Sequence, residues 1–255
     1  MFNEFHYQVR GRGHHADGTL GQDRTDYLKS HGVQVLCLAD GAGSATHSAF
    51  GAQAVTSAGC ALLAQRFHDF ASGEDAAGAR EEIVAVLQAR LEETADRLGC
   101  AVTDLASTFL AVALSEDRFV IAHIGDGVIG YVKHGELKVA STPDNSEFAN
   151  ETTFVTSGSA AASLRLFRGS LDDVSGFILM SDGTSASLFD QRTKSFAPAC
   201  AKLISMVAEA PTRQTANPAH KKALKRVVDT QIRAATKDDC SVGIFGRRTR
   251  IALTG

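Results

Sequence analysis

The stretch VQVLCLADG, residues 33–41, joins a run of apolar, partly β-branched residues to an Asp-Gly pair. Such a run predicts a buried β-strand over Val33–Ala39, and the Asp-Gly pair, a common turn signal, predicts where that strand ends. The same pair recurs at Asp126-Gly127 and at Asp182-Gly183, each soon after another apolar run that predicts a strand. Three strands that end in a carboxylate and a glycine are therefore the starting point for both fold and function.

The rest of the chain alternates between helical segments and short strands in hairpin order. Strands are predicted over Thr108–Leu114, Arg118–His123, Gly130–His134, Glu136–Ala140, Phe154–Thr156, Gly176–Met180 and Ser241–Phe245, and helices over about Ala49–Phe67, Ala79–Leu98, Ala199–Ala208 and Ala219–Ala234. This order favours an α+β fold over alternating βαβ units. No stretch rich in Pro, Gly or Ser divides the chain, so residues 1–255 are predicted to form a single domain.

Composition argues against several classes of protein. The 255 residues carry a formal net charge of -3, which provides no basic field for nucleic acid. No apolar run reaches the roughly 18 residues of a membrane span, and Asn3, Glu4 and His6 lie where a signal peptide would place its apolar segment, so a cytoplasmic protein is expected. The 5 cysteines include no CxxC pair, and neither a disulfide framework nor a zinc site is predicted.

The Asp-Gly pairs have two interpretations. For any single pair a turn is favoured, and Asp17-Gly18, which follows no apolar strand, is interpreted as a turn only. The set is better explained by a metal site, because strand ends hold carboxylates rigidly and a following glycine lets a backbone carbonyl approach a cation. Asp238-Asp239 directly precedes a predicted strand, so it can join the same edge of an antiparallel sheet.

Several carboxylates at one edge repel one another unless a cation lies among them. Oxygen ligands suit Mg²⁺ or Mn²⁺, and two such ions can share a water and lower its pKa, so that it attacks a phosphate ester. The residues alone therefore predict an oxygen-ligated metal hydrolase.

The order of these motifs resembles that of the type 2C metal-dependent serine/threonine protein phosphatases, above all their short bacterial branch. The most specific stretch is Ala39–Ala45, ADGAGSA, which continues to Ser48 and Gly51-Ala52. The other matching segments, in the order of the family, are Gln22-Asp23, Ser107–Phe109, His123–Asp126, Phe148–Thr152, Ser181–Gly183 and Asp238–Val242. The resemblance thus spans about residues 13–242.

The resemblance implies a central β-sandwich of two antiparallel sheets with helices on both faces, in αββα layers, and two Mn²⁺ or Mg²⁺ ions at one end. By position, Asp40 resembles the carboxylate that bridges the two metals, and Gly41 resembles the residue that offers its backbone carbonyl. The other implied roles are ligands of the second metal for Asp182 and Asp238, orientation of metal-bound waters for Asp23, and a further, weaker metal for Asp126. The implied reaction is direct attack of the bridging hydroxide, without a phosphoenzyme.

Two positions depart from the family pattern. Many members hold the substrate phosphate with an arginine, and the matching position here is His14. A histidine can bind phosphate when protonated or act as general acid for the leaving alkoxide, so His14 is a candidate catalytic residue. Ala186 occupies the place of an acidic partner four residues after Asp182, which weakens the case for a third ion and predicts slower turnover.

The remaining candidates have simpler interpretations. His15 is interpreted as incidental, His47 as a surface or helix-start residue, and His123 as a core histidine. Glu147 and Asn150 could line the site, but their segment is loop-like.

Three functions are compatible with this pattern. The favoured one is a phosphoprotein phosphatase of bacterial signalling that reverses a serine/threonine kinase. The alternatives are a pseudophosphatase that only binds phosphoprotein, and a hydrolase of small phosphate esters. The presence of Asp40, Asp182 and Asp238 argues against the pseudophosphatase, because a binding module has no chemical need for a crowded acidic edge.

Overall fold

Two five-stranded antiparallel sheets face each other in the computed structural model, which describes residues 1–143, 152–210 and 218–248. Sheet A has the order β1 (Phe2–Val9), β12 (Cys240–Arg247), β9 (Val174–Met180), β6 (Val128–Lys133) and β7 (Glu136–Ser141). Sheet B has the order β2 (Arg24–Ser30), β3 (Val33–Ala39), β4 (Phe109–Ser115), β5 (Arg118–Ile124) and β8 (Arg165–Ser170).

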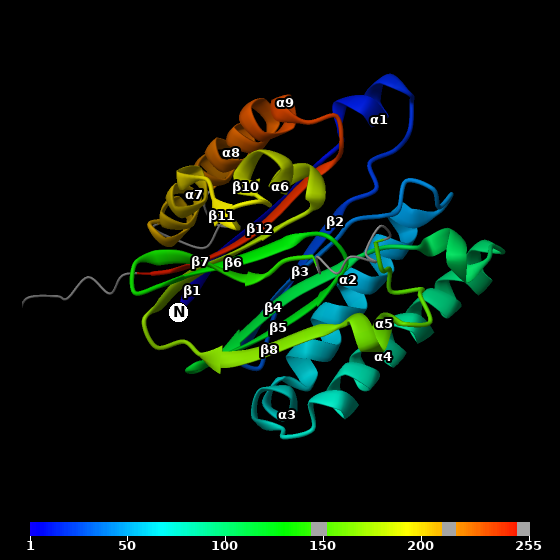
Figure 1. Ribbon diagram of the computed structural model, residues 1–255, viewed down its shortest axis with the longest axis horizontal. Helices are drawn as coiled ribbons and strands as arrows, with labels where there is room; N and C mark the ends of the chain where they lie inside the picture. Colours follow the sequence, from blue (N-terminus) through cyan, green and yellow to red (C-terminus); the bar gives the residue numbers. More distant parts are fainter. Residues whose placement is uncertain (144–151, 211–217, 249–255) are drawn as a thin grey trace, which may run out of the picture.

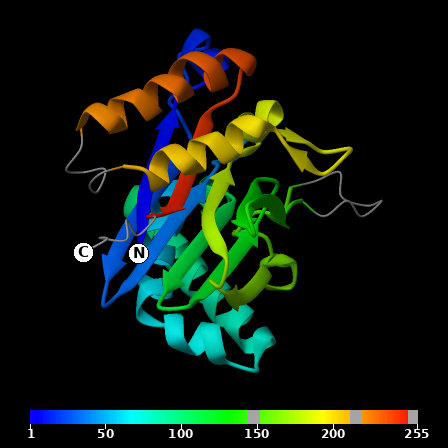
Figure 2. The same cartoon turned by 90° about the vertical axis from the view of Figure 1, so that its left-hand side faces the viewer.

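A layer of helices covers the outer face of each sheet, as Figures 1 and 2 show. Sheet B is covered by α2 (Ser48–Gln65), α3 (Phe67–Ser72) and α4 (Ala76–Leu98), and sheet A by α7 (Pro198–Ala208) and α8 (Pro218–Val227), which continues as a π-helical turn (Val228–Ile232) and α9 (Arg233–Ala235). Short elements complete the described chain: α1 (Arg12–Ala16), a 3₁₀ turn (Val102–Leu105), α5 (Ala160–Ser163), α6 (Asp182–Leu188), and the small hairpin β10 (Phe189–Asp190) and β11 (Ser195–Phe196). The predicted α+β sandwich in αββα layers is confirmed.

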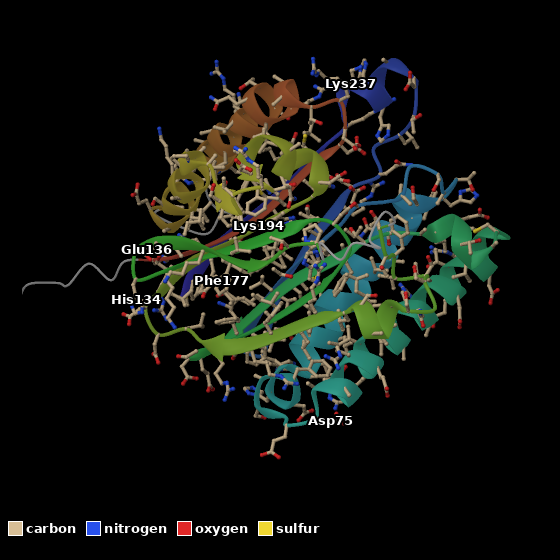
Figure 3. All side chains as sticks on the ribbon, in the orientation of Figure 1. Asp75, His134, Glu136, Phe177, Lys194 and Lys237 are labelled. Carbon is tan, nitrogen blue, oxygen red and sulfur yellow. The ribbon has the colours of Figure 1, made fainter. Side chains whose placement is uncertain are left out.

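The apolar run of β3 is explained by its place between two cores. Val35 and Cys37 pack toward α2 and α4, whereas Leu36 and Leu38 pack between the sheets. A strand covered on both faces needs apolar residues at every position, not at alternate ones. Phe177 of β9 points into the same space between the sheets (Figure 3). Complete burial of a side chain such as Leu36 contributes about 1.5–3 kcal/mol.

Of the ten strands in the two large sheets, the sequence missed three, and all three lie at sheet edges. The short strands β10 and β11 were also not predicted. β1 is one edge of sheet A, while β2 and β8 are the two edges of sheet B. Each mixes charged or polar residues with apolar ones, which weakens the strand pattern but prevents pairing with another molecule.

One predicted strand is wrong. Phe154–Thr156 lies outside the strands, in a turn whose backbone bonds run from Val155 N–H to Ser107 O (2.9 Å) and from Ser157 N–H to Phe154 O (3.0 Å). The apolar side chains are used for packing instead, since Val155 is fully buried against the helices over sheet B.

Candidate active site

Strand register brings the predicted aspartates to one end of the sandwich. Asp23 precedes β2 and Asp40 follows β3, and because Arg24 pairs with Ala39 the two carboxylates are neighbours. On sheet A, Met180 pairs with Val242 on one side and with Val128 on the other. The end of β9 therefore lies beside the start of β12 and the start of β6, which carry the remaining acidic residues toward the same place.

Asp40 lies at the centre of this cluster. Its backbone is fixed to β4, because Asp40 N–H donates to Thr108 Oγ1 and Thr108 N–H donates to Asp40 O, both at 2.8 Å. Its side chain keeps some contact with solvent but is densely surrounded. Burial, followed by the charges of Asp23 and Asp182, raises the pKa of the Asp40 carboxyl well above its ordinary range. Asp40 thus holds a proton readily or requires a cation.

Asp23 is a buried carboxyl whose oxygens have no hydrogen-bond donor. Its side chain is 2% exposed, and both Oδ atoms accept no hydrogen bond from any described residue. Burial raises the pKa of Asp23 to about 7, although nearby Asp40, Ser241 and Ser181 lower it in part. A buried carboxylate without hydrogen-bond donors is costly, so the site favours either a protonated Asp23 or a cation against its oxygens.

Asp182 begins helix α6, directly after the end of β9. Its Oδ1 accepts a hydrogen bond from Gly183 N–H at 2.5 Å. Burial raises the pKa of Asp182; contact with Asp40 lowers it, and the charges of Asp238 and Asp126 raise it further. These effects place Asp40, Asp126 and Asp238 within electrostatic reach of Asp182.

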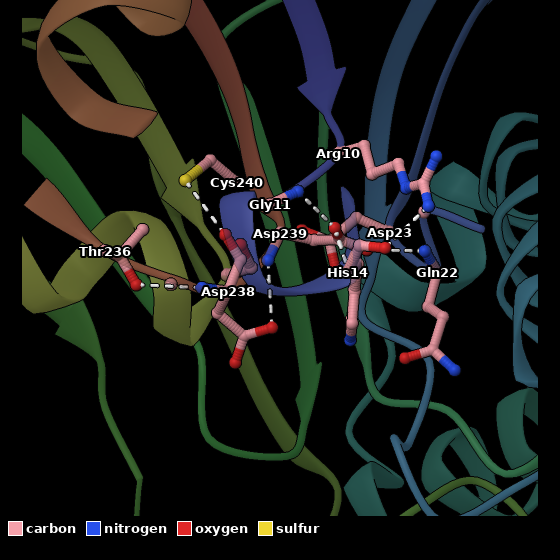
Figure 4. Close-up of polar contacts among 12 residues, drawn as sticks. Arg10, Gly11, His14, Gln22, Asp23, Thr236, Asp238, Asp239 and Cys240 are labelled. Carbon is pink, nitrogen blue, oxygen red and sulfur yellow. Dashed lines mark hydrogen bonds and ion pairs between the residues drawn. The ribbon is translucent and has the colours of Figure 1, made fainter. Parts of the chain in front are cut away.

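Asp238 and Asp239 are adjacent in sequence but lie in opposite environments. Asp238 is exposed, whereas Asp239 is 2% exposed. One Asp239 oxygen accepts a hydrogen bond from Gly11 N–H and the other from Gln22 N–H, each at 2.5 Å. Figure 4 shows Asp239 between the segment after β1 and the start of β12. Asp239 therefore anchors the N-terminal segment to the site.

His14 is held in this network by Asp239. His14 Nδ1 lies 3.0 Å from Asp239 Oδ1, close enough for an ion pair, although the angles do not fit a hydrogen bond. The His14 side chain is 22% exposed. Arg10 donates from its guanidinium to the His14 carbonyl at 2.5 Å. A partly exposed histidine fixed by a buried carboxylate is suited to binding or protonating an anion.

The donor set fits a hard divalent cation. Among the described residues, no three His, Cys, Asp or Glu side chains converge in the manner of a complete metal cage. Mg²⁺ does not need such a cage, because it keeps several waters and takes one or two carboxylates. All the clustered donors are oxygens, and a cation would bind the free Asp23 oxygens and relieve the repulsion around Asp40.

Comparison with known proteins assigns the fold and the family. The protein-family model described as protein phosphatase 2C matches residues 10–229. The chain belongs to the protein phosphatase 2C family. Serine/threonine-protein phosphatase 3 of Escherichia coli (strain K12) is 34% identical over 131 residues, which is 51% of this chain and 51% of that protein. The match therefore spans about half of the length of this relative.

Solved phosphatase 2C-like structures share the fold at low sequence identity. A bacterial serine phosphatase has a TM-score of 0.65 at 15% identity, with 98% of this chain and 100% of that chain covered. The serine/threonine phosphatase Stp1 from Staphylococcus aureus has a TM-score of 0.64 at 16% identity, with 98% and 96% covered. RsbX in complex with magnesium has a TM-score of 0.53 at 12% identity, with 96% and 94% covered.

The other positions singled out from the sequence fall in two groups. Asp126 is at the cluster and accepts a hydrogen bond from Thr152 Oγ1 at 2.7 Å, and Gly41 packs so closely on α2 that a Cβ there would lie 2.8 Å from Ser48 Cβ. Packing alone thus requires glycine at position 41. The other group is His15, Asp17 and Ala186, which are exposed, and His47, whose ring packs on Phe50.

His123 is a core histidine, as expected. Its side chain is fully buried, Nδ1 lies 2.7 Å from Ser141 Oγ, and burial lowers its pKa well below its ordinary value. Glu147, Asn150 and most of the matching segment Phe148–Thr152 lie outside the described residues.

Sequence reasoning missed Asp239 as a separate functional position. The signal was present in the dipeptide, because alternate residues of an extended segment point to opposite sides. Two adjacent aspartates at a strand start could therefore not both face the cluster in the same way.

Proposed function

We propose that this phosphatase 2C family member is a metal-dependent protein serine/threonine phosphatase that hydrolyses phosphoserine and phosphothreonine. The observation that carries the proposal is the cluster of Asp23, Asp40 and Asp182, with two unpartnered buried oxygens and raised pKa values, at one end of the sandwich. The magnesium complex of the structurally similar RsbX supports a role for Mg²⁺ or Mn²⁺.

The residues would divide the work as follows. Asp40, which lies between Asp23 and Asp182, would hold divalent ions together with the Gly41 carbonyl, Asp182 and Asp238. Asp23 would orient bound waters, and Asp126 would contribute to a further, weaker site. When bound, two divalent ions lower the pKa of a shared water and offset the negative charge of the phosphate.

The reaction is a direct displacement at phosphorus. The water releases a proton to solvent as its oxygen forms a bond to phosphorus, the bond from phosphorus to the serine or threonine oxygen breaks, and the leaving alkoxide takes a proton. His14, fixed by Asp239, is placed to supply that proton or to bind the phosphate. We expect the substrate to be a phosphoprotein made by a serine/threonine kinase in the cytoplasm. None of the described helices combines the length and apolarity that a membrane crossing requires.

The test is hydrolysis of a phosphothreonine peptide by wild type and Asp40→Asn with Mn²⁺, with Mg²⁺ and with excess chelator. Metal-dependent phosphate release that is lost in the variant is the expected result. Hydrolysis of p-nitrophenyl phosphate or a sugar phosphate without hydrolysis of the peptide would instead indicate a small-molecule hydrolase. A folded wild type that releases no phosphate with any metal would overturn the proposal.

A further inference from the structure

A groove lies in the helix layer over sheet A, apart from the carboxylate cluster. It has a volume of about 390 Å³ and is bounded by α6, α7 and the π-helical turn after α8. Leu188, Leu203 and Ile232 form an apolar floor, and their side chains are 7%, 4% and 3% exposed. An open groove with such a floor can take the apolar side chains of a partner.

The rim of this groove is positively charged. α7 and α8 contain no Asp or Glu, and Lys202 of α7 lines the groove itself. Lys222 and Arg226 line an adjoining hollow of about 380 Å³, which shares Val227 with the groove. In the described part of the chain, no carboxylate forms an ion pair with Lys202, Lys222 or Arg226. One cation in the groove and two in the adjoining hollow favour a partner that is both acidic and apolar.

The helix layer over sheet B lacks this character. α2 and α4 also enclose a hollow, of about 480 Å³, but its charged rim residues Arg90 and Glu93 are paired at 2.9 Å. Arg66 at the end of α2 is likewise paired, with Asp69 and Glu82. The one cation that lines the hollow between α2 and α4 is therefore paired, whereas Lys202 in the groove over sheet A has no ion-pair partner among the described residues.

Helix α6 connects the groove to the candidate active site. Asp182, the first residue of α6, belongs to the carboxylate cluster, and Leu188, its last residue, forms part of the groove floor. Six residues of helix span roughly 9 Å. A segment bound in the groove would therefore lie within one short linker of the carboxylates.

We propose that this groove docks an acidic segment with apolar anchors, carried by the phosphoprotein substrate itself. The inference rests on the proposed function, because it assigns a substrate class to that site. Leucine-like side chains fill the floor, and flanking Asp or Glu residues pair with Lys202, Lys222 and Arg226. Docking holds the phosphorylated residue of the same chain near the cluster and raises its effective concentration.

The test compares three phosphothreonine peptides with one common core. The first is the core alone, the second adds a flexible linker of about six Gly/Ser residues and a Glu/Leu segment, and the third adds the same linker with a Lys/Leu segment. With Mn²⁺, we expect the Glu/Leu peptide to have a KM about ten-fold below that of the core, with similar kcat. The Lys/Leu peptide should show no such decrease. Equal KM values for the two extended peptides would overturn the docking proposal.

Variants of residues in the groove and the adjoining hollow test whether the lower KM of the Glu/Leu peptide depends on this groove. Lys222→Glu/Arg226→Glu should abolish the KM advantage and leave hydrolysis of the core peptide unchanged. The control Arg80→Glu/Arg97→Glu on α4 changes the net charge equally and should keep the advantage. Ala199→Trp, which fills the groove, should also remove the advantage, whereas Ala61→Trp in the hollow over sheet B should not. An advantage that survives both groove variants would contradict the proposal.

A binding measurement separates this proposal from the proposed function. Fluorescence anisotropy with a labelled Glu/Leu segment that carries no phosphate should show equal affinity for wild type and Asp40→Asn. Lys222→Glu/Arg226→Glu should bind at least five-fold more weakly, and added salt should weaken the wild-type complex. If no peptide is hydrolysed but this pattern holds, the docking site stands and the proposed reaction fails. Affinity that is indifferent to the charge reversal overturns the docking site.

Discussion

The two sheets hold their carboxylates in different ways at the candidate active site. On the side of sheet B, Asp23 is 2% exposed and the backbone of Asp40 is hydrogen bonded to β4. On the side of sheet A, Asp182 is partly exposed at the start of a short helix and Asp238 is exposed before β12. Sheet B thus provides a rigid, electrostatically strained half, and sheet A provides a half that is more open to solvent at Asp182 and Asp238.

The largest difference between the halves should appear in activity. Asp40→Asn should lower kcat/KM with Mn²⁺ by about 10³-fold, because it removes charge from the centre of the cluster. Asp238→Asn, in the exposed half, should lower it by only about ten-fold to 10²-fold and should be partly rescued by more metal. Steady-state kinetics over a Mn²⁺ titration measure both, and equal losses would refute the distinction.

Asp23, in the half on the side of sheet B, should make the metal-free protein less stable as pH rises. The folded pKa of Asp23 is about 7, above its ordinary 3.8, so between these values the folded protein holds a proton that the unfolded chain releases. Stability is thus fully present below about pH 4 and is lost toward pH 7, by at most on the order of 4 kcal/mol. Urea unfolding in chelator should show this fall, and Asp23→Asn should flatten it. If the free energy of unfolding of the wild type did not change over this pH range, the result would argue against ionisation of a buried Asp23 carboxyl.

A histidine in β1 of sheet A should show the opposite dependence on pH. Burial, followed by the charges of Lys221 and Lys225, lowers the pKa of His6 from 6.5 to about 4. The folded state then binds fewer protons than the unfolded chain in this window, so stability is present above about pH 6.5 and is lost as pH falls toward 4, by at most about 3 kcal/mol. His6→Asn should remove this component in unfolding experiments. Retention of the full acid dependence in the variant would assign it to other groups.

The smallest effects should distinguish the adjacent residues Asp238 and Asp239. Asp239→Asn weakens the bonds to Gly11 and Gln22 and the contact with His14, so it should cost about 1–3 kcal/mol of stability. It should also lower kcat, because His14 loses the contact that fixes its position. Asp238→Asn should leave thermal stability within about 0.5 kcal/mol. Similar melting temperatures for the two variants would contradict the separation of roles.

Much of the fold was predictable, because the central strands carry strong apolar patterns. Val33–Ala39 and Gly176–Met180 are strands as predicted, and their Asp-Gly ends meet as proposed. The edge strands β1, β2 and β8 were not predictable in the same way, since a strand with one open edge needs polar residues that blur its pattern. That residues 1–255 form a single domain stays a prediction.

The residue types of the candidate site could be predicted from the sequence, but the burial of each residue could not. The predicted aspartates lie together at one end of the sandwich, and their roles stay a prediction. Which of them would be buried, however, depended on register and on contacts between distant segments, such as Gly11 with Asp239. Local sequence contains no information on such contacts, which explains why the partner of His14 was missed.

The pairing of the first strand with the last has a consequence for synthesis. β12 lies between β1 and β9 in sheet A, and it carries Asp238 and Asp239 at its start. A nascent chain that has not yet released residues 238–247 from the ribosome can form neither the middle of sheet A nor the complete site. A product truncated before Asp238 therefore lacks an inner strand of sheet A and two of the aspartates of the candidate site.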